Sequence, residues 1–412
     1  MCLWPPAGFR WIIRLPMEIY LLDWLNLLLR WLHFIAGVAW IGASFYFVML
    51  DSSLRQPARA QDKERGVTGE LWAVHGGGIY QSQKFLLGPV GESLSEHLHW
   101  SKWEAYTTWL SGIGLLVVVY WFGAGSYLID SQVMPLSIPG AIAISLGVIV
   151  AGWVVYDLLC KGLRGRDALL AAIIFVLVAA VAWSLFQLLS ARAAFLHVGA
   201  MMGTIMAANV FFHIIPGQKR IVAQMRAGAT PDAEPGIVGK QRSVHNTYFT
   251  LPVLFIMISN HYPMTYSHQN GWLVLVFLML AGVLIRQYFV QRHGGRAQLA
   301  LPAVALLLLL SMVWYLSPKA IDTAPGGDVS TARVSGIIAT RCVACHASQP
   351  TQPGFAAAPL GLVMETPEQI TNNAARIATT VQSRYMPIGN LTGMTDGERA
   401  VVAAWYAQLQ QQ

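Results

Sequence analysis

Charged residues are scarce in this chain. Asp, Glu, Lys and Arg make up 11% of its 412 residues, hydrophobic residues make up 55%, and the mean hydropathy is +0.50. Average soluble domains carry about 25% charged and about 45–50% apolar residues. So few charges cannot cover a soluble core of this size, which excludes a cytosolic globular enzyme. The shortage also excludes a disordered chain and a nucleic-acid-binding protein. The composition predicts a protein embedded in a lipid bilayer.

Long apolar runs and net charge are both missing from residues 328–412. This segment contains five Arg and five Asp or Glu, so the whole formal charge of +7 belongs to residues 1–327. Pro and Gly are frequent between the two parts, as is typical of a linker. The predicted organisation is a membrane domain (1–317), a linker (318–328) and a small soluble domain (329–412).

Eight stretches approach the length of about 20 mostly apolar residues that a membrane-spanning helix needs. We therefore predict an all-α fold with an eight-span helical membrane domain. The first stretch is longer than one straight crossing requires and should leave the membrane near Asp51. The predicted spans are roughly 19–50, 102–122, 136–158, 168–190, 193–215, 240–261, 271–291 and 298–317.

Seven loops connect these spans. The second and sixth loops, 123–135 and 262–270, contain no Lys or Arg, and the fourth contains only Arg192. The first, third, fifth and seventh loops carry all the other loop cations. Because basic loops stay in the cytoplasm, this alternation places both termini on the outer face. We expect a multi-pass protein of a bacterial inner membrane, with residues 329–412 in the periplasm.

The N-terminus contains two cations that disagree with this orientation, Arg10 and Arg14. They would be absent if translation started at Met17 instead of Met1. No signal-peptide cleavage pattern precedes the first span, so we expect that helix to be retained.

Only four cysteines are present, and two belong to the run Cys342-Val343-Ala344-Cys345-His346. C-x-x-C-H is the attachment signature of a c-type haem. Its two thiols bond the vinyl groups, and His346 becomes an axial iron ligand. A zinc half-site or a redox C-x-x-C is the alternative, but no further Cys or His follows His346. Cys2 and Cys160 stand alone, and Cys160 reads as an apolar filler. We predict one covalent haem c.

A second axial ligand should come from the loop before the last helix. Met386, followed by Pro387, is the preferred candidate because a thioether ligand raises the reduction potential of a His-ligated iron. Met394 and Met364 are the alternatives. Helices are predicted over 329–341, 367–382 and 398–410, the last opened by a capping box at Thr395–Glu398. The tail resembles a small class I cytochrome c, a carrier of single electrons.

Ten of the eleven histidines belong to the membrane part. Polar groups at membrane depth are costly and are therefore functional candidates. Each histidine could simply pair with a neighbour, two could clamp a b-type haem, or several could line a substrate pocket as acid, base or hydrogen-bond donor. These interpretations stay open. The topology puts His197 and His261 near the outer face, His33 near mid-bilayer, and His97, His99, His213 and His245 in the inner half.

Five segments resemble, in order, the membrane-bound urate oxidase (urate hydroxylase) family: Tyr20–Trp24, Ala39–Phe45, Val74–Gly78, His99–Tyr106 and Met257–Pro263, followed by the C-x-x-C-H motif. The resemblance extends from about residue 17 to the end. It implies an eight-span domain fused to a cytochrome c. The implied reaction, in purine catabolism, is oxidation of urate to 5-hydroxyisourate, with electrons passed to cytochrome c and the respiratory chain instead of oxygen. It brings no established catalytic residues.

Urate is a planar anion, and its site needs a cation or N–H donors, an aromatic surface and a base. One candidate site lies on the cytoplasmic side, and another lies near the outer face. Our catalytic candidates are His33, His97, His99, His245 and His261. The cytoplasmic site would combine His97, His99 and His245 with Lys84, Lys102, Arg242, Trp100, Trp103 and Tyr248. The outer site would use Asp23, His197, His261 and Tyr262, and His33 could serve either.

The membrane thickness constrains this choice. Its hydrocarbon core is about 30 Å thick, too far for one electron transfer from a cytoplasmic site to an external haem. Either the urate site opens outward, or a b-type haem or a metal in the membrane domain bridges the distance. The expected partners are urate and a respiratory-chain acceptor such as a cytochrome c oxidase or a soluble cytochrome.

Two other functions are compatible with the sequence. The first is a membrane-anchored cytochrome c that carries electrons for quinone or a partner dehydrogenase and oxidises no substrate itself. The second is a transporter or sensor with a cytochrome appendage.

Overall fold

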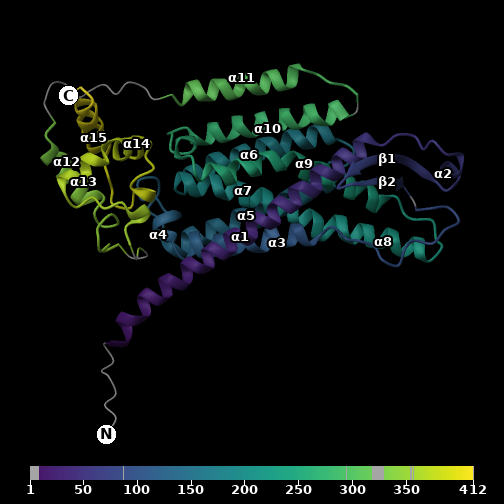
Figure 1. Cartoon of the computed structure of the whole chain (residues 1–412), viewed down its shortest axis with the longest axis horizontal. Helices are drawn as coiled ribbons and strands as arrows, with labels where there is room; N and C mark the ends of the chain where they lie inside the picture. The colour runs from purple at the N-terminus through teal and green to yellow at the C-terminus, as the bar shows by residue number, and fades with distance from the viewer. Residues whose placement is uncertain are drawn as a thin grey trace, which may run out of the picture.

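The computed structural model describes residues 9–86, 88–293, 295–317, 329–352, 355 and 357–411. The predicted linker, 318–328, lies outside these ranges. A bundle of long helices carries a small helical domain at one end (Figure 1). The helices of the bundle are α1 (Phe9–Ser53), α3 (Trp103–Leu115), α5 (Ile138–Gly162), α6 (Asp167–Phe186), α7 (Ala191–Ala208), α8 (Ile215–Arg226), α9 (Glu234–Ser259), α10 (Gly271–His293) and α11 (Ala300–Tyr315).

Each of the eight predicted spans is helical. Two of them include a π-helical turn: η1 (Leu116–Trp121) continues α3, and η2 (Asn209–Ile214) joins α7 to α8. Shorter helical pieces complete this domain: α2 (Ala60–Glu64), α4 (Ala124–Tyr127) and the 3₁₀ turn η3 (Pro263–Thr265).

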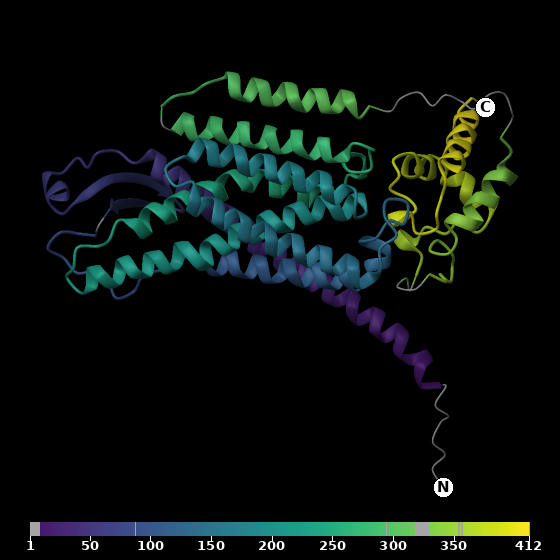
Figure 2. The same ribbon diagram turned by 180° about the vertical axis from the view of Figure 1, so that it is seen from behind.

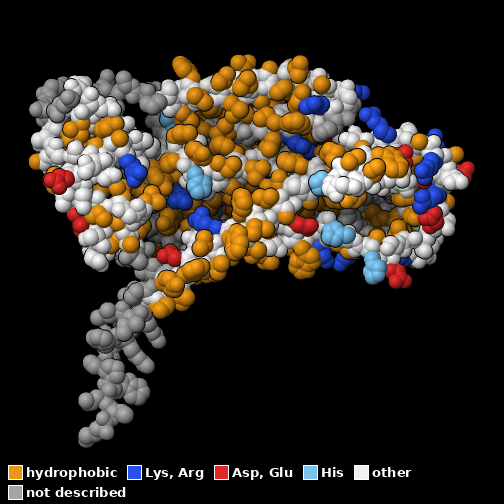
Figure 3. All heavy atoms as spheres, in the orientation of Figure 1, with side chains coloured by type: hydrophobic (Ala, Val, Ile, Leu, Met, Phe, Trp, Pro, Cys, Tyr) orange, Lys and Arg blue, Asp and Glu red, His pale blue; other side chains and the backbone are white. Residues whose placement is uncertain are grey.

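Five helical stretches of the described chain are long and apolar enough to cross a membrane: Tyr20–Ser53, Ile138–Gly162, Asp167–Phe186, Ala191–Arg226 and Gly271–Arg292. The surface around them is dominated by hydrophobic side chains (Figure 3). Phe34 and Val313 are each 70% exposed, for example. An apolar surface of this extent requires a covering, and these helices are consistent with a membrane protein.

The prediction of an all-α fold is wrong for residues 67–85, which form an antiparallel hairpin of β1 (Val67–His75) and β2 (Gly78–Phe85). Its turn consists of Gly76 and Gly77, with φ of 58° and 81°. Glycine adopts these left-handed conformations readily, and two-residue hairpin turns require them. The Val74–Gly78 run therefore makes a turn. The hairpin lies in the first loop, between the predicted spans 19–50 and 102–122.

The hairpin, α2 and α8 lie at the end of the bundle opposite the small domain (Figures 1 and 2). Lys and Arg side chains gather there (Figure 3). Several form ion pairs with nearby carboxylates, including Arg65 with Glu92 at 2.7 Å and Lys84 with Asp51. The basic first loop and the small domain thus occupy opposite ends, which is the arrangement predicted by the alternating loop charges.

The small domain packs four helices around buried Val334, Ile338, Ile377, Val402 and Trp405. The predicted helix over 367–382 is in fact two helices, because Asn373 leaves the helical conformation and its side chain donates to the Gln369 carbonyl at 2.8 Å. The helices are α12 (Thr331–Arg341), α13 (Pro367–Asn372), α14 (Ala374–Gln382) and α15 (Asp396–Leu409), with the 3₁₀ turns η4 (Pro359–Gly361) and η5 (Ile388–Asn390).

The predicted capping box of α15 is confirmed. Glu398 N–H donates to Thr395 Oγ1 at 3.2 Å, and Thr395 N–H donates to Glu398 Oε2 at 2.7 Å. Arg341 at the end of α12 donates to the other Glu398 oxygen at 3.0 Å. Burial alone would raise the pKa of Glu398, but the bonds from Thr395 and Arg341 lower it overall. The carboxylate therefore stabilises the junction of α12 and α15.

Replacing Thr395 with Ala should lower the free energy of opening of α15 by about 1 kcal/mol, the usual value of an N-cap. Because the pKa of Glu398 is lowered, its contribution is present above the ordinary carboxyl pKa and is lost as the pH falls through the folded value. The difference between wild type and variant should thus shrink in acid. Hydrogen exchange of the α15 amides measures it, with Thr395→Ser as the control. Equal protection in all three proteins at neutral pH would contradict the cap's role.

Candidate functional site: a C-x-x-C-H pocket and two buried polar clusters

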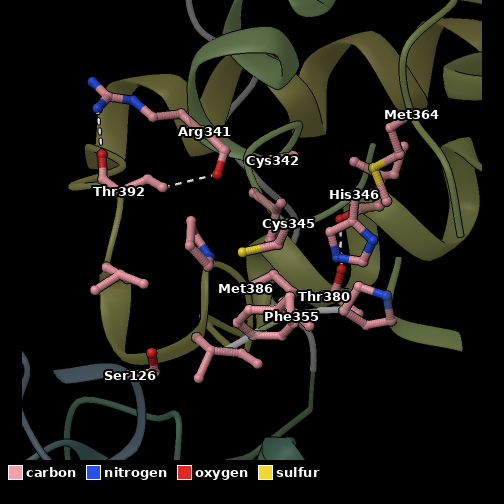
Figure 4. A pocket seen from close by; sticks show the side chains of 16 residues that line it. Ser126, Arg341, Cys342, Cys345, His346, Phe355, Met364, Thr380, Met386 and Thr392 are labelled. Atoms are coloured by element: carbon pink, nitrogen blue, oxygen red, sulfur yellow. Dashed lines mark hydrogen bonds between the residues drawn. The ribbon is translucent and has the colours of Figure 1, made fainter. Parts of the chain in front are cut away.

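A pocket in the small domain is lined by Cys342, Cys345 and His346 (Figure 4). The wall opposite the motif is mainly apolar, as a porphyrin requires. Among the residues that complete the wall are Phe355, Met364, Ile377, Val381, Met386, Ile388 and Leu391.

The imidazole of His346 is held in one orientation. Its Nδ1–H donates to the Leu362 carbonyl at 2.9 Å, which leaves Nε2 unprotonated and available to a metal. A bond of this kind is the usual support of a metal-binding histidine. Two thiols and an oriented imidazole on one turn fit the donor set of a c-type haem.

The two thiols do not fit a zinc site. Burial raises the pKa of Cys342 to about 12 and also raises that of Cys345. A structural zinc site would need further ligands beside these two thiols and His346. No group of three His, Cys, Asp or Glu side chains suited to a metal ion occurs among the described residues.

Met386 lines the pocket, and its loop is held by a buried cation. Arg399 Nη1 donates to the carbonyls of Met386 and Val381, at 2.7 Å each. Met364 also lines the pocket, but its backbone N–H donates to the carbonyl of His346 at 2.8 Å. The backbone of Met364 therefore lies on the same side of the pocket as His346, whereas a second axial ligand has to come from the opposite side. Met394 is buried in the core and is not among the lining residues. Met386 remains the preferred second ligand.

Replacing Met386 with Ala should lower the reduction potential of the haem and remove the weak near-infrared absorption of a methionine–iron bond. Covalent attachment through Cys342 and Cys345 should persist. Potentiometric titration of the purified protein measures the shift, and Met364→Leu is the matched control, expected to leave the potential nearly unchanged. A shift in the Met364 variant with none in the Met386 variant would assign the ligand to Met364.

The C-x-x-C-H pocket adjoins the helix bundle. Ser126 of α4 forms part of its wall. A Cβ on Gly389 would lie 2.9 Å from the Ser126 carbonyl oxygen and 3.0 Å from that of Ile129, and its φ is 55°. Only glycine permits this approach of η5 to α4. Tyr385, next to Met386, packs against the bundle core.

A polar cluster lies at this end of the bundle, which we call the Arg192 cluster: Tyr120, Tyr127, Arg192, Asn260 and Tyr266. Arg192 Nε donates to Asn260 Oδ1 at 3.2 Å, and its Cζ lies 5.4 Å from the Tyr127 ring centroid. The Tyr120 and Tyr127 rings are 6.2 Å apart. The hydroxyls of Tyr120 and Tyr266 are buried and have no hydrogen-bond partner in the described chain.

His197 packs against Tyr120 of this cluster. Its ring lies edge-on to Tyr120, with centroids 5.9 Å apart. Nδ1–H donates to the Ala193 carbonyl at 2.7 Å, and Nε2 accepts from Ser145 Oγ at 2.6 Å, which in turn accepts from Trp121 Nε1 at 2.9 Å. Both ring nitrogens are therefore committed, so His197 positions its neighbours. The other predicted members of an outer site, Asp23, His261 and Tyr262, are exposed.

A second cluster, the Asp157 cluster, lies near the opposite end of the bundle. Asp157 accepts from Arg242 and His213 at 2.7 Å each and from Lys161 at 2.6 Å. Arg242 also lies over the ring of Tyr156, 5.0 Å from its centroid. One carboxylate thus compensates the buried Arg242, although Arg242 Nε and Nη1 have no partner within the described ranges.

The Asp157 cluster continues into a neutral network. The Tyr156 hydroxyl and His245 Nδ1 are 2.8 Å apart, and Asn209 donates to Tyr156 at 3.0 Å and to Asn246 at 2.9 Å. The structure thus brings Arg242 and His245 together, as expected. It adds Tyr156, Asp157 and Asn209, which we had not predicted. A lone Asp in an apolar run was the available signal for Asp157.

The other predicted cytoplasmic residues have different surroundings. His97 and His99 are exposed between β2 and α3. Lys84 pairs with Asp51, Lys102 lies 5.6 Å from the ring of Trp103, and Tyr248 donates to Gln287. Trp100 packs in a small cluster with Ala105. His33 Nδ1–H donates to the Thr108 carbonyl at 2.9 Å.

The fold and pockets define a helical protein whose apolar helices have membrane-spanning length and whose helix bundle contains two buried polar clusters. Residues 19–317 match the family described as Urate oxidase N-terminal, and the chain belongs to this family. The match covers the helix bundle and ends before the small domain. It indicates an oxidoreductase with a urate-related function. Comparisons with curated proteins and with solved structures give no significant match.

Proposed function

We propose that the protein crosses a bacterial inner membrane eight times and oxidises urate to 5-hydroxyisourate. Its electrons would leave through a haem c held by Cys342, Cys345, His346 and Met386, on the periplasmic side, for a respiratory-chain acceptor. One observation carries the proposal: Ser126, from the domain that matches the urate oxidase family, forms part of the wall of the C-x-x-C-H pocket. Substrate domain and electron exit are therefore adjacent.

The reaction balances without oxygen as oxidant. Urate and one water give 5-hydroxyisourate, two protons and two electrons, and the new hydroxyl oxygen comes from water. A bound haem c supplies one-electron redox chemistry. For each urate, two electrons therefore pass one at a time to an external acceptor. This chain's own residues have to bind the urate anion, exclude bulk water and place the substrate near the pocket.

The contact between Ser126 and the pocket also bears on a second cofactor. A site near this end of the bundle makes a bridge across the bilayer unnecessary. Both ring nitrogens of His197 are hydrogen-bonded to protein groups, and His213 is paired with Asp157. We therefore propose one haem c per chain and neither a b-type haem nor a metal in the bundle.

Anaerobic addition of urate to the oxidised protein should reduce the haem, because substrate electrons have no other exit. The absorption of reduced haem c measures this. His346→Ala should lose the response, since the iron loses its axial ligand. Dithionite reduction of wild type gives the full amplitude as the reference.

The alternative is a membrane-anchored cytochrome that serves quinone or a partner dehydrogenase. Under that function urate leaves the spectrum unchanged, while a reduced quinone or a dehydrogenase reduces the haem. This result would exclude urate oxidation by the chain. A transporter or sensor would respond to neither donor.

A pyridine haemochrome spectrum should show only c-type haem, at one per chain, because the haem motif occurs once in the sequence. Metal analysis of the same sample should find iron in that ratio and no other metal in stoichiometric amount. A b-type component that persists through purification, and that is lost when His33, His213 or His245 is replaced, would support the bridging cofactor instead.

A further inference from the structure

Within the described chain, Arg192 is a half-buried cation without a carboxylate partner. Its Nε donates to the neutral amide oxygen of Asn260 at 3.2 Å, and its charge also acts on the nearby Tyr120 hydroxyl. Arg242 in the Asp157 cluster, by contrast, is paired with Asp157 at 2.7 Å. An uncompensated charge away from water is costly, and a bound anion would offset that cost. The Arg192 cluster thus lacks a negative group that the Asp157 cluster already has.

Two hydroxyls of the same cluster also lack partners. Tyr120 and Tyr266 are 4% and 3% exposed, and neither hydroxyl is hydrogen-bonded in the described part of the chain. Both lie close enough to Arg192 for its charge to act on them, as do Tyr127 and Tyr385. Buried polar groups are normally satisfied. A cation, two unsatisfied hydroxyls and surrounding tyrosine rings match a flat anion that carries N–H and carbonyl groups.

The cluster also lies beside the electron exit. Tyr127 directly follows Ser126, which lines the haem pocket, and Tyr385 directly precedes Met386. Tyr385 packs against the bundle core and lies near Tyr266. Two of the tyrosines around Arg192 are therefore chain neighbours of pocket residues. The Asp157 cluster lies toward the far end of the bundle.

From these observations we infer that the Arg192 cluster is the binding site for the urate anion. Arg192 pairs with the anion, and the hydroxyls of Tyr120 and Tyr266 hydrogen-bond its carbonyl and N–H groups. His197, through Ser145 and Trp121, is a positioning residue that fixes Tyr120. The inference rests on the proposed function and names the site at which that function begins.

Urate binding by itself is the first test, measured by equilibrium dialysis of anaerobic, dithionite-reduced, full-length protein in detergent, in which the haem can accept no further electron. Arg192→Gln should weaken binding about tenfold or more, as expected for loss of a charged hydrogen bond. Arg192→Lys, which keeps the charge but not the planar fork, should recover part of the affinity. Arg226→Gln removes an exposed charge at the opposite end and should bind as wild type does.

Tyr266→Phe separates an effect on urate binding from an effect on the fold. Because its hydroxyl has no partner in the described chain, removing it should not destabilise the fold, and weaker urate binding then reports a lost ligand contact. Tyr156→Phe is the matched change in the Asp157 cluster and should leave urate affinity unchanged. Haem content and the dithionite-reduced spectrum of each variant verify that the small domain is intact.

The outcomes separate the two proposals. Binding that weakens in the Tyr156 and Arg242 variants but not in the Arg192 and Tyr266 variants moves the site to the Asp157 cluster and overturns the inference. A wild type that binds no urate overturns it as well. A wild type that binds urate through Arg192 but leaves the haem oxidised supports the site and refutes the proposed oxidation.

Discussion

The contact between η5 and α4 is the constraint on which the functional arrangement depends. Gly389 can approach the carbonyls of Ser126 and Ile129 only because it has no Cβ. This contact closes the C-x-x-C-H pocket with a residue of the helix bundle. Arg399 then holds Met386 and the same loop from the other side. One close backbone approach therefore fixes both the position of the Met386 loop and the distance between the two domains.

Polar groups inside the bundle follow a second constraint, because a bilayer offers them no water. Both polar clusters draw side chains from π-helical turns: Tyr120 and Trp121 from η1, and Asn209 and His213 from η2. A π-helical turn widens the helix and shifts the direction of the following side chains, and such turns recur at functional sites. In this bundle the two turns aim residues of otherwise apolar helices toward the interior.

The sequence predicted the parts of this structure that depend on composition and local chemistry. Apolar length located all eight helical segments, and Thr395 with Glu398 located the start of α15. It missed the hairpin at residues 67–85, because a short polar-flanked strand pair has no membrane signal. It also joined α13 to α14, since a single Asn is a weak helix terminator compared with Gly or Pro.

The site was predicted less completely, for a physical reason. Histidines and cations stand out in an apolar sequence, so His197, Arg242 and His245 were found. Tyr120, Tyr127 and Tyr266 were not, because tyrosines in membrane helices are ordinary residues of the interface. Their significance comes from three elements meeting around Arg192, a long-range juxtaposition without a local pattern. Arg192 itself was counted only as the lone cation of an outer loop.

Arg192 departs from the pattern of the loop charges. Basic residues are expected on the inner side, yet this one stands at the start of α7, at the end of the bundle that carries the small domain. It does not serve as a topological anchor there, since that role belongs to the opposite end. Nor does it form an ion pair in the described structure. A cation retained against the charge rule, half-buried and facing unsatisfied hydroxyls, is best explained by an anion that it has to bind.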